Sequence, residues 1–250
     1  MDLLYGYHPV LEALRAHRRR IHGVYLGQGK GAPRRQAIAD AARQAGVAVE
    51  WVTPQQVTAM VGHSRHQDAC AKVSPYPIVE VEDLLADASR MADPAWVLLL
   101  DQVVDPQNLG AMARTAHCAG VQGIILPKDR SAPPSAAASK ASAGALEHMH
   151  LAYVTNLVDT IIKLKDHGLW VAGADRDGGR SIFEADLSGS LALVIGGEEK
   201  GLRPLVRKHC DFIVSIPQTG PVGSLNASAA AAVIIYESFR QRSEGLRRGA

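Results

Sequence analysis

From residue 96 onward, short continuous apolar runs alternate with segments that have a helical pattern. The runs read WVLLL, GIIL, WVAGA, LALVIGG and FIVSIP, at residues 96–100, 123–126, 170–174, 191–197 and 212–217. Continuous apolar runs are typical of strands that are covered on both faces, and the intervening segments are long enough for crossover helices. The pattern predicts a parallel α/β domain.

The first 75 residues show the same alternation on a smaller scale. HPVLEALRA and PRRQAIADAARQAG predict helices at 8–16 and 33–46, and HGVYL, VAVEW and CAKVS predict strands at 22–26, 47–51 and 70–74. We therefore expect a small α/β domain over residues 1–75 and a second domain over 95–250. An acidic, proline-containing linker at 76–94 would join them.

One segment, SAPPSAAASKASAGA at residues 131–145, is unusually rich in small residues. Small side chains allow close backbone approach, so the segment could pack tightly against another element. A plain alanine-rich helix explains the same composition equally well.

Composition is that of an ordinary globular protein, with 47% hydrophobic and 21% charged residues. Three cysteines without close spacing argue against a disulfide framework or a zinc site and favour a reducing compartment. No secretory signal pattern is visible at the N-terminus, so we expect a cytoplasmic protein. Residues 212–236 carry no charge, but prolines and glycines in their first half predict a buried functional segment instead of a membrane span.

Charge is distributed unevenly, although the net charge is only +2. Residues 1–75 hold 10 Lys and Arg against 5 Asp and Glu, and the remainder holds 17 against 20. A basic N-terminal third favours a partner that carries phosphates. A basic solvated surface without a partner remains an alternative on this signal alone.

The first candidate motif is DPQNLGAMARTAHCAG, residues 105–120. Asp105 and Pro106 are typical of a helix start and Gly120 of a helix end, which leaves Asn108 and Arg114 unexplained. In one helix these two would lie about 120° apart around the axis. They would converge on one ligand only if Asn108 preceded the helix; otherwise they are a cap and a surface cation.

Two further motifs follow predicted strands. VIGGEEKGL, residues 194–202, ends a strand in two glycines, which allows a ligand to approach the backbone at the carboxyl edge of a parallel sheet. It lacks the spacing of dinucleotide and triphosphate loops. In SIPQTGPVGSLNAS, residues 215–228, Ser224 and Asn226 could each cap a helix. The long uncharged loop before them indicates a ligand that is contacted through few charges.

Together, DPQNLGAMARTA, LVIGGEEKGL and IPQTGPVGSLNASAAAA resemble, in order and spacing, the three signature motifs of the SpoU (TrmH-like) branch of the SPOUT RNA 2′-O-methyltransferases. GYHPVLEAL at 6–14 and HQDACAKV at 66–73 resemble the ends of the small domain, similar to ribosomal protein L30e, that precedes the catalytic domain in members acting on ribosomal RNA. Asp68 stands where this family usually has glycine.

The resemblance implies methyl transfer from S-adenosylmethionine to a ribose 2′-hydroxyl, with a guanosine of 23S rRNA as the expected target. It also implies a homodimer whose C-terminal α/β domain is tied in a trefoil knot. It implies no metal. The implied site residues are Asn108, Arg114, Glu198, Ser224 and Asn226 for catalysis, and Gly196, Gly197, Ile216, Pro217 and Leu225 for the cofactor. For RNA phosphates, the basic N-terminal domain offers Arg15, Arg18, Arg19, Arg20 and Arg65.

Several alternatives stay open at the level of sequence. Relatives of this kind are proposed to use the residue matching Arg114 as general base, but a guanidinium rarely gives up its proton, so a phosphate clamp is the more conservative role. The target could instead be a tRNA or an adenosine of ribosomal RNA. A protein that binds RNA without catalysis is the alternative from a different functional class.

Overall fold

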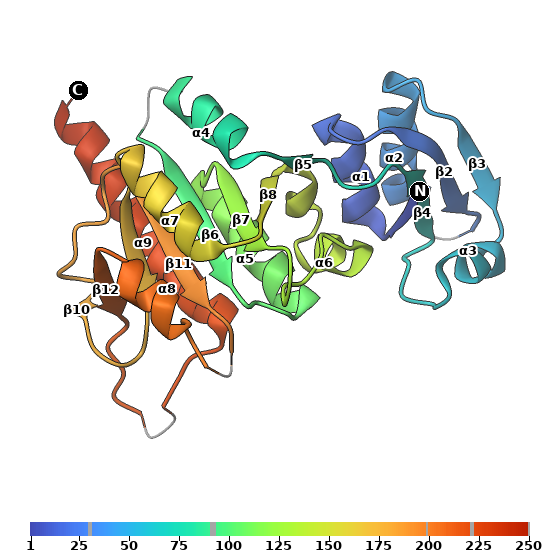
Figure 1. Ribbon diagram of the computed structural model, residues 1–250. Helices are drawn as coiled ribbons and strands as arrows, with labels where there is room; N and C mark the ends of the chain where they lie inside the picture. Colours follow the sequence, from blue (N-terminus) through green and yellow to red (C-terminus); the bar gives the residue numbers. More distant parts are fainter. Residues whose placement is uncertain (30–31, 91–93, 199, 221–222, 250) are drawn as a thin grey trace. The chain divides into compact units, whose positions relative to one another are not determined.

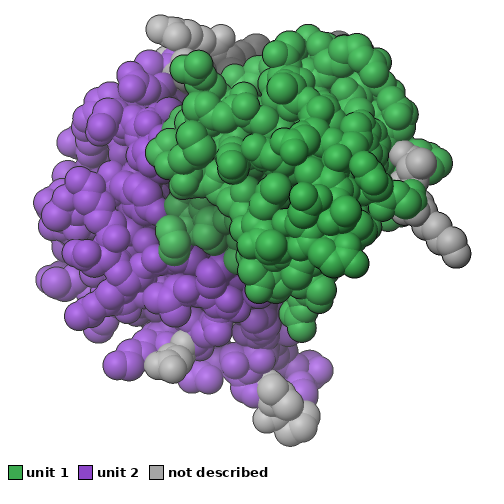
Figure 2. Space-filling model, turned by 90° about the vertical axis from the view of Figure 1, so that its right-hand side faces the viewer, with its two compact units in different colours: residues 1–77, 133–148 green, residues 78–132, 149–250 purple. Residues whose placement is uncertain are grey.

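The structure is a computed structural model that describes residues 1–29, 32–90, 94–198, 200–220 and 223–249. The chain forms two compact units (Figure 2). Unit 1 comprises residues 1–77 and 133–148, and unit 2 comprises residues 78–132 and 149–250. The units therefore follow the predicted division of the chain except at residues 133–148, which lie in the predicted second domain but belong to unit 1.

Unit 1 is built on a sheet whose strands, among the described residues, number four in the order β1-β4-β2-β3. The β2–β3 pair is parallel and the other two pairs are antiparallel. The helices α1 (Tyr7–Ala16) and α2 (Ala32–Gln44) cover one face, where Leu4, Leu14 and Ile38 are fully buried. The strands are β1 (Asp2–Tyr5), β2 (Ile21–Gly27), β3 (Val49–Val52) and β4 (Ala69–Val73).

The helix α3 (Pro54–Val61) packs on the opposite face of this sheet, against Cys70. Its start carries a capping box in which Thr53 accepts from the backbone N–H of Gln56, and the Gln56 side chain accepts from the backbone N–H of Thr53. The predicted helices and strands of this region are confirmed to within a few residues. Strand β1 and helix α3 were not predicted.

Residues 133–148 contribute α6 (Ala136–Ala141) and the 3₁₀ helix η1 (Ala145–His148) to unit 1. A Cβ at Gly144 would lie 2.8 Å from the Cβ of Glu12 and from the carbonyl oxygen of His8, so only glycine permits this approach to α1. Both interpretations of the small-residue segment are correct, because the segment forms a short helix and also packs closely against α1.

A buried ion pair holds this segment to the rest of unit 1. The Arg19 guanidinium lies 3.6 Å from the Glu147 carboxylate and 2.6 Å from that of Asp2, and it donates to the carbonyl of Ser74. Burial raises the pKa of Glu147, and the nearby cation of Arg19 opposes this shift. The hydroxyl of Tyr76 donates to the carbonyl of Leu146 over 2.6 Å. Arg19 is only 6% exposed, and its guanidinium contacts Asp2, Ser74 and Glu147. It therefore has a structural role and is not available to an RNA phosphate, which corrects the predicted RNA contact.

Unit 2 contains a sheet that, in the described part of the chain, has eight strands in the order β10-β12-β9-β11-β6-β7-β8-β5, with every pair parallel. The predicted parallel α/β domain is confirmed, and all five apolar runs form strands. The strands are β5 (Ile78–Val79), β6 (Trp96–Asp101), β7 (Gly123–Pro127), β8 (His150–Val154), β9 (Trp170–Ala174), β10 (Arg180–Ser181), β11 (Leu191–Gly196) and β12 (Phe212–Ser215). Strands β5, β8 and β10 were not predicted.

Helices cover both faces of this sheet (Figure 1). On one face, Leu84 and Ile161 pack against Val97 and Leu99 of β6. On the other, α5 and α9 pack against each other and α9 contacts β11. The helices are α4 (Val81–Arg90), α5 (Pro106–Ala119), α7 (Leu157–Asp166), α8 (Pro204–His209) and α9 (Ala227–Gly249). The predicted linker thus contains β5 and α4, and its leucines belong to the core.

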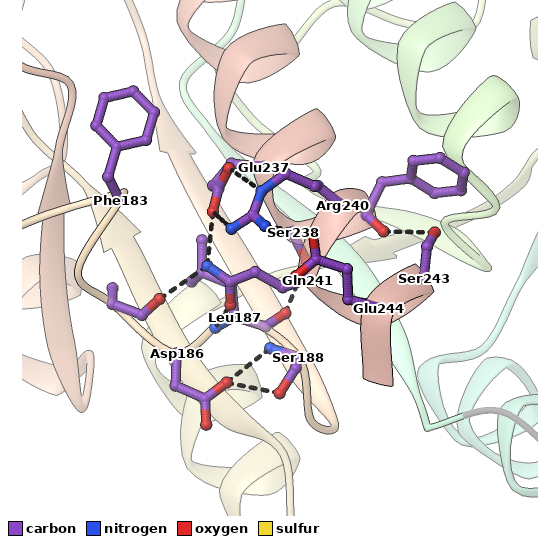
Figure 3. Close-up of polar contacts among 12 residues, drawn as sticks. Phe183, Asp186, Leu187, Ser188, Glu237, Ser238, Arg240, Gln241, Ser243 and Glu244 are labelled. Carbon is purple, nitrogen blue, oxygen red and sulfur yellow. Dashed lines mark hydrogen bonds and ion pairs between the residues drawn. The ribbon is translucent and has the colours of Figure 1, made fainter. Parts of the chain in front are cut away.

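The second half of α9 is fastened to the segment before β11 (Figure 3). The Gln241 side chain accepts from the backbone N–H of Leu187 over 2.7 Å and donates to the carbonyl of Ala185 over 3.0 Å. The Ser238 hydroxyl donates to the carbonyl of Leu187 over 2.8 Å. These bonds satisfy the backbone of a loop and fix the direction of the last helix.

The described residues of the uncharged stretch 212–236 include β12 and the first turns of α9. Among the described residues, no helix is both long and apolar enough to cross a lipid bilayer. The trefoil knot stays a prediction from the family resemblance.

The loop before β4 has a backbone that suits glycine at position 68, the residue that the family resemblance leads one to expect there. Gln67 and Asp68 have φ values of 54° and 55°, in the left-handed region, which aspartate tolerates better than most residues. The Asp68 carboxylate lies 3.3 Å from the Arg35 guanidinium. The side chain of Asp68 therefore compensates for the strained backbone that glycine would adopt freely.

His66 lies buried in the same loop and has a defined tautomer. Its Nδ1 accepts from the backbone N–H of Asp68 over 3.0 Å, so Nε2 carries the proton and donates to the Thr58 hydroxyl over 2.8 Å. Burial lowers the pKa of His66 below its ordinary value of 6.5, and the carboxylate of Asp68 opposes this shift only in part.

We expect acidification to destabilise unit 1 through His66. Because the folded pKa is lowered, the unfolded chain binds the proton more tightly, so the contribution is complete above pH 6.5 and declines as the pH falls below it. The melting temperature of the wild type should therefore fall more between pH 7.5 and 5 than that of His66→Gln. His22, which is exposed, supplies the control, since His22→Gln should keep the wild-type slope. Equal slopes for His66→Gln and the wild type would contradict the assignment.

Candidate functional site

The loops that carry the second and third motifs meet at the carboxyl edge of the unit 2 sheet. Strands β12, β9, β11 and β6 are parallel neighbours, so the loops that follow them emerge on the same side. A cavity of about 260 Å³ lies at this edge, between the ends of β9, β11 and β12 and the start of α9. In open parallel sheets this edge is the usual place for a ligand.

Most of the predicted residues of the second and third motifs line this cavity. Its walls include Gly196, Gly197, Glu198, Ile216, Ser224 and Leu225. Leu225 is 43% exposed although it is apolar, and Ile195, Val214 and Ile234 line the same cavity. Pro217 follows Ile216 directly but is not part of the lining. The cavity therefore offers an apolar wall and backbone groups of two glycines.

Asn108, Glu198 and Asn226 form a hydrogen-bonded chain beside the cavity. The Asn108 amide donates from Nδ2 to Oε1 of Glu198, and its Oδ1 accepts from Nδ2 of Asn226 over 3.2 Å. Asn226 also caps α9, because its Oδ1 accepts from the backbone N–H groups of Ser228 and Ala229. The first, second and third motifs are thus joined by two side-chain bonds.

Arg114 is not part of this group. Helix α5 begins at Pro106, so Asn108 lies inside its first turn and not before it. Arg114 follows six residues later, about 120° further around the axis. It is exposed and, among the residues that the structure describes, has no hydrogen bond or ion pair. Within one chain, the two polar residues of the first motif do not converge.

The double glycine is required by the backbone itself. A Cβ at Gly196 would lie 2.2 Å from the carbonyl carbon of Gly201, and one at Gly197 would lie 2.5 Å from the carbonyl oxygen of Gln102. The backbone N–H of Gly201 donates to the carbonyl of Gly197 over 3.1 Å, which folds the loop back on itself. The sequence interpretation assigned these glycines to ligand approach, but they also make this tight loop possible.

A buried carboxylate at the end of β6 holds the loop in place. Asp101 is fully buried, and its two oxygens accept from the backbone N–H of Arg203 over 2.9 Å and from its Nε over 2.7 Å. Sequence reasoning missed Asp101. The signal was a charged residue immediately after the apolar run WVLLL, where a strand of a parallel sheet ends.

The loop after β9 forms a further wall of the cavity, which the sequence did not lead us to predict. Asp175, Arg176 and Asp177 line the cavity. The guanidinium of Arg207, on α8, lies 3.3 Å from the Asp175 carboxylate and donates to the carbonyl of Asp177 over 2.6 Å. The charged sequence directly after the run WVAGA was the available signal, since it too follows a strand of the parallel sheet.

The predicted RNA-contacting arginines occupy different environments. Arg15 pairs with Glu12 over 2.8 Å, and the guanidinium of Arg18 lies over the ring of Tyr76. Arg20 and Arg65 are exposed, whereas Arg19 is the buried residue described above. For metals, the described residues contain no group of three or more His, Cys, Asp or Glu side chains that could hold an ion.

Two family models match the chain. The SpoU rRNA Methylase family matches residues 95–236, and the model for RNA 2′-O ribose methyltransferase substrate binding matches residues 3–79. The chain therefore belongs to the SpoU rRNA methylase family, as the resemblance of its motifs predicted.

Relatives of known name match along the full chain. The 23S rRNA (guanosine-2′-O-)-methyltransferase RlmB of Pseudomonas putida is 39% identical over 245 residues, which cover 97% of each chain. RlmB of Escherichia coli K12 is 36% identical over 242 residues, covering 97% of this chain and 99% of the relative.

Solved structures share the fold. The SpoU methyltransferase AviRb of Streptomyces viridochromogenes, in complex with the cofactor AdoMet, superposes with a TM-score of 0.77 at 24% identity, over 96% of this chain and 90% of that chain. An RNA 2′-O ribose methyltransferase superposes with a TM-score of 0.80 at 22% identity, over 96% and 88%.

Substitution of the glycines provides a test of the loop. Gly196→Ala should lower the free energy of unfolding by about 3 kcal/mol, because its Cβ would overlap backbone that cannot move aside. Gly189→Ala is the matched control, since nothing lies within 4 Å of its Cβ position, and it should change stability by less than about 0.5 kcal/mol. Equal unfolding midpoints in urea for the two variants would contradict the packing described.

Proposed function

We propose that this protein transfers a methyl group from S-adenosylmethionine to the 2′-hydroxyl of a guanosine ribose in 23S ribosomal RNA. The observation that carries the proposal is the fixed Asn108–Glu198–Asn226 chain next to a cavity with an apolar wall, at the carboxyl edge of a parallel sheet. RlmB relatives, which match 97% of this chain, support the choice of a guanosine in 23S rRNA.

One wall of the cavity fits S-adenosylmethionine in its chemistry, since it is apolar, beside the charged wall of Asp175, Arg176 and Asp177. An adenine ring and a methionine arm need apolar surface and backbone donors and acceptors more than charges. The residues proposed to hold them are Gly196, Gly197, Ile216, Pro217 and Leu225, of which all but Pro217 line the cavity. When bound, the sulfonium group supplies the methyl group. The exposed apolar side chain of Leu225 supports this assignment, because a ligand would cover it.

Asn108 is the residue best placed to orient a ribose. Its side-chain amide is held at both ends, because Nδ2 donates one N–H to Glu198 and Oδ1 accepts one hydrogen bond from Asn226. One further N–H and one lone pair remain for a hydroxyl of the substrate. A ribose bound in this way would be fixed beside the cavity, which lowers the entropic cost of bringing the hydroxyl in line with the methyl group. Ser224, in the cavity wall, completes the proposed set.

Arg114 is proposed as a clamp for an RNA phosphate. A guanidinium has five N–H donors and no acceptor, so it suits a phosphate far better than it suits a proton to be removed. Its exposed position without an internal partner among the described residues supports this role.

A homodimer in the cytoplasm completes the proposal. The side chains of Val233, Tyr236 and Phe239 are 39%, 49% and 41% exposed along one side of α9, although they are large and apolar. A second copy of the chain would remove this surface from water. Cys70, Cys118 and Cys210 are all free, in keeping with a reducing compartment.

A map of ribose methylation tests the proposed reaction. Cells that lack the gene should lose 2′-O-methylation at one guanosine of 23S rRNA, and the purified wild-type protein with S-adenosylmethionine should restore it. Asn108→Ala should restore it about 100-fold more slowly, since one positioned donor is lost. An unchanged map would refute the function, whereas loss of a mark in tRNA or at an adenosine would correct the target only.

Arg114→Lys separates the clamp from the general base. A clamp keeps its charge but loses bidentate contact, so KM for RNA should rise about 10-fold while the basic limb of the pH–rate profile stays in place. A basic limb that moves with the substitution would show that residue 114 takes the proton. The measurement is the initial rate of methyl incorporation across pH, with saturating S-adenosylmethionine.

A further inference from the structure

The described helices of unit 1 cover one face of its sheet less completely than the other. Helices α1 and α2 bury the face that carries Leu4 and Val24. On the opposite face, α3 covers Cys70, and the neighbouring side chains of Leu3, Tyr5 and Tyr25 remain only half-buried. This second face is therefore partly open to solvent.

Two lysine–tyrosine pairs lie on this second face. The Lys72 ammonium lies 5.2 Å from the centre of the Tyr25 ring, and the Lys140 ammonium lies 5.1 Å from the centre of the Tyr5 ring. Tyr5 and Tyr25 are both in register with Cys70, one on each side of β4. Two strand spacings separate the backbones of Tyr5 and Tyr25 by roughly 10 Å. We name Tyr5, Tyr25, Lys72 and Lys140 the lysine–tyrosine face.

The cations of this face are not neutralised by the protein. Among the described residues, neither Lys72 nor Lys140 has a carboxylate within ion-pair distance. Arg65 lies beside Lys140, which donates to its carbonyl, and the His63 ring packs edge-on against Tyr5 at 4.6 Å. Desolvation lowers the pKa of Lys140, and the like charge of Arg65 lowers it further.

The acidic residue Glu50 borders the face. Glu50 is the register partner of Tyr25 on β3, so its side chain lies on the same side of the sheet, and it is exposed. The net charge of the face is nevertheless positive, because Lys72, Lys140 and Arg65 are cations and Glu50 carries one negative charge. The face therefore favours an anion.

We propose that the lysine–tyrosine face, together with Arg65, binds an unpaired segment of the RNA substrate, with phosphates at the lysines and bases against Leu3 and the tyrosine edges. The inference rests on the proposed function and names the surface that would hold its substrate. Positive side chains next to aromatic ones are the pattern by which proteins hold single-stranded nucleic acid. The match of residues 3–79 to a substrate-binding model supports this partner over an acidic protein.

Lys140 comes to this surface from a part of the chain far from the other three residues in sequence. It lies on α6, in the part of the chain that the SpoU methylase model matches, yet α6 belongs to unit 1. The lysine–tyrosine face thus combines side chains from β1, β2 and β4 with one from residues 133–148. A chain cut down to residues 1–79 would lack Lys140 and the ion pair of Arg19 with Glu147 that supports its segment.

Binding of RNA by the full chain tests the inference. The probe is a fluorescein-labelled 20-nucleotide RNA of mixed sequence, single-stranded or annealed to its complement, measured by anisotropy without S-adenosylmethionine. Lys72→Gln/Lys140→Gln should raise Kd for the single strand about 10-fold. Loss of two phosphate contacts should reduce the slope of log K against log salt by about 1.4. Glu50→Gln should tighten binding, because it removes the carboxylate that borders the face.

A matched control lies on the covered side of unit 1. Arg34 and Arg43 are exposed cations of α2. Arg34 lies over a tyrosine ring, that of Tyr7, at 5.8 Å, and Arg43 pairs with Asp40 over 3.0 Å. Arg34→Gln/Arg43→Gln removes the same charge and should leave Kd and the salt slope at their wild-type values. Equal weakening by both double variants would overturn the inference, since only net charge would then matter.

Further readouts keep this inference distinct from the proposed function. The double lysine variant should bind S-adenosylmethionine in calorimetry as the wild type does and should melt at the same temperature. A wild type that transfers no methyl group to any RNA would refute the proposed function, while a loss of single-strand binding in the lysine variant would still uphold the surface. Unchanged single-strand affinity in that variant, or a loss confined to the duplex, would refute the surface.

Discussion

The buried carboxylate of Asp101 is the interaction on which the site of unit 2 depends. It ends β6, just before the first motif, and binds the backbone and side chain of Arg203, just after the second. A fully buried carboxylate is costly unless its oxygens are satisfied, and here both accept bonds. The loop between Gly197 and Arg203 is thereby pinned next to α5, where Glu198 meets Asn108.

Close backbone packing also holds the loop after β11 in place. Gly196 and Gly197 bring the loop within van der Waals contact of Gly201 and Gln102, which leaves no space for a side chain. The cavity wall on this side is consequently backbone, and the wall on the other side is fixed by Arg207. Hydrogen bonds and close contacts within the chain thus hold both walls in place, and alignment of two reactants depends on walls held in this way.

Unit 1 depends on a different buried charge. Arg19 joins the N-terminal strand, the end of β4 and Glu147 of the segment 133–148. In sequence this segment lies between two parts of unit 2, but it belongs to unit 1. The chain therefore passes between the two units three times instead of once. An arginine that looks like one of a row of surface cations in RAHRRR is in fact the centre of a folded network.

By itself, the sequence determined the class of fold and the family, because both are written in local patterns. Apolar runs and helix signals predicted the parallel sheet, and three motifs in order predicted a SpoU methylase. Asn108 and Glu198 could be singled out, but their contact across 90 residues could not. Only the tertiary structure decided that Asp101 clamps the site, that Arg19 is buried and that Lys140 belongs to unit 1. Burial and long-range pairing depend on how distant segments pack, and no local pattern encodes them.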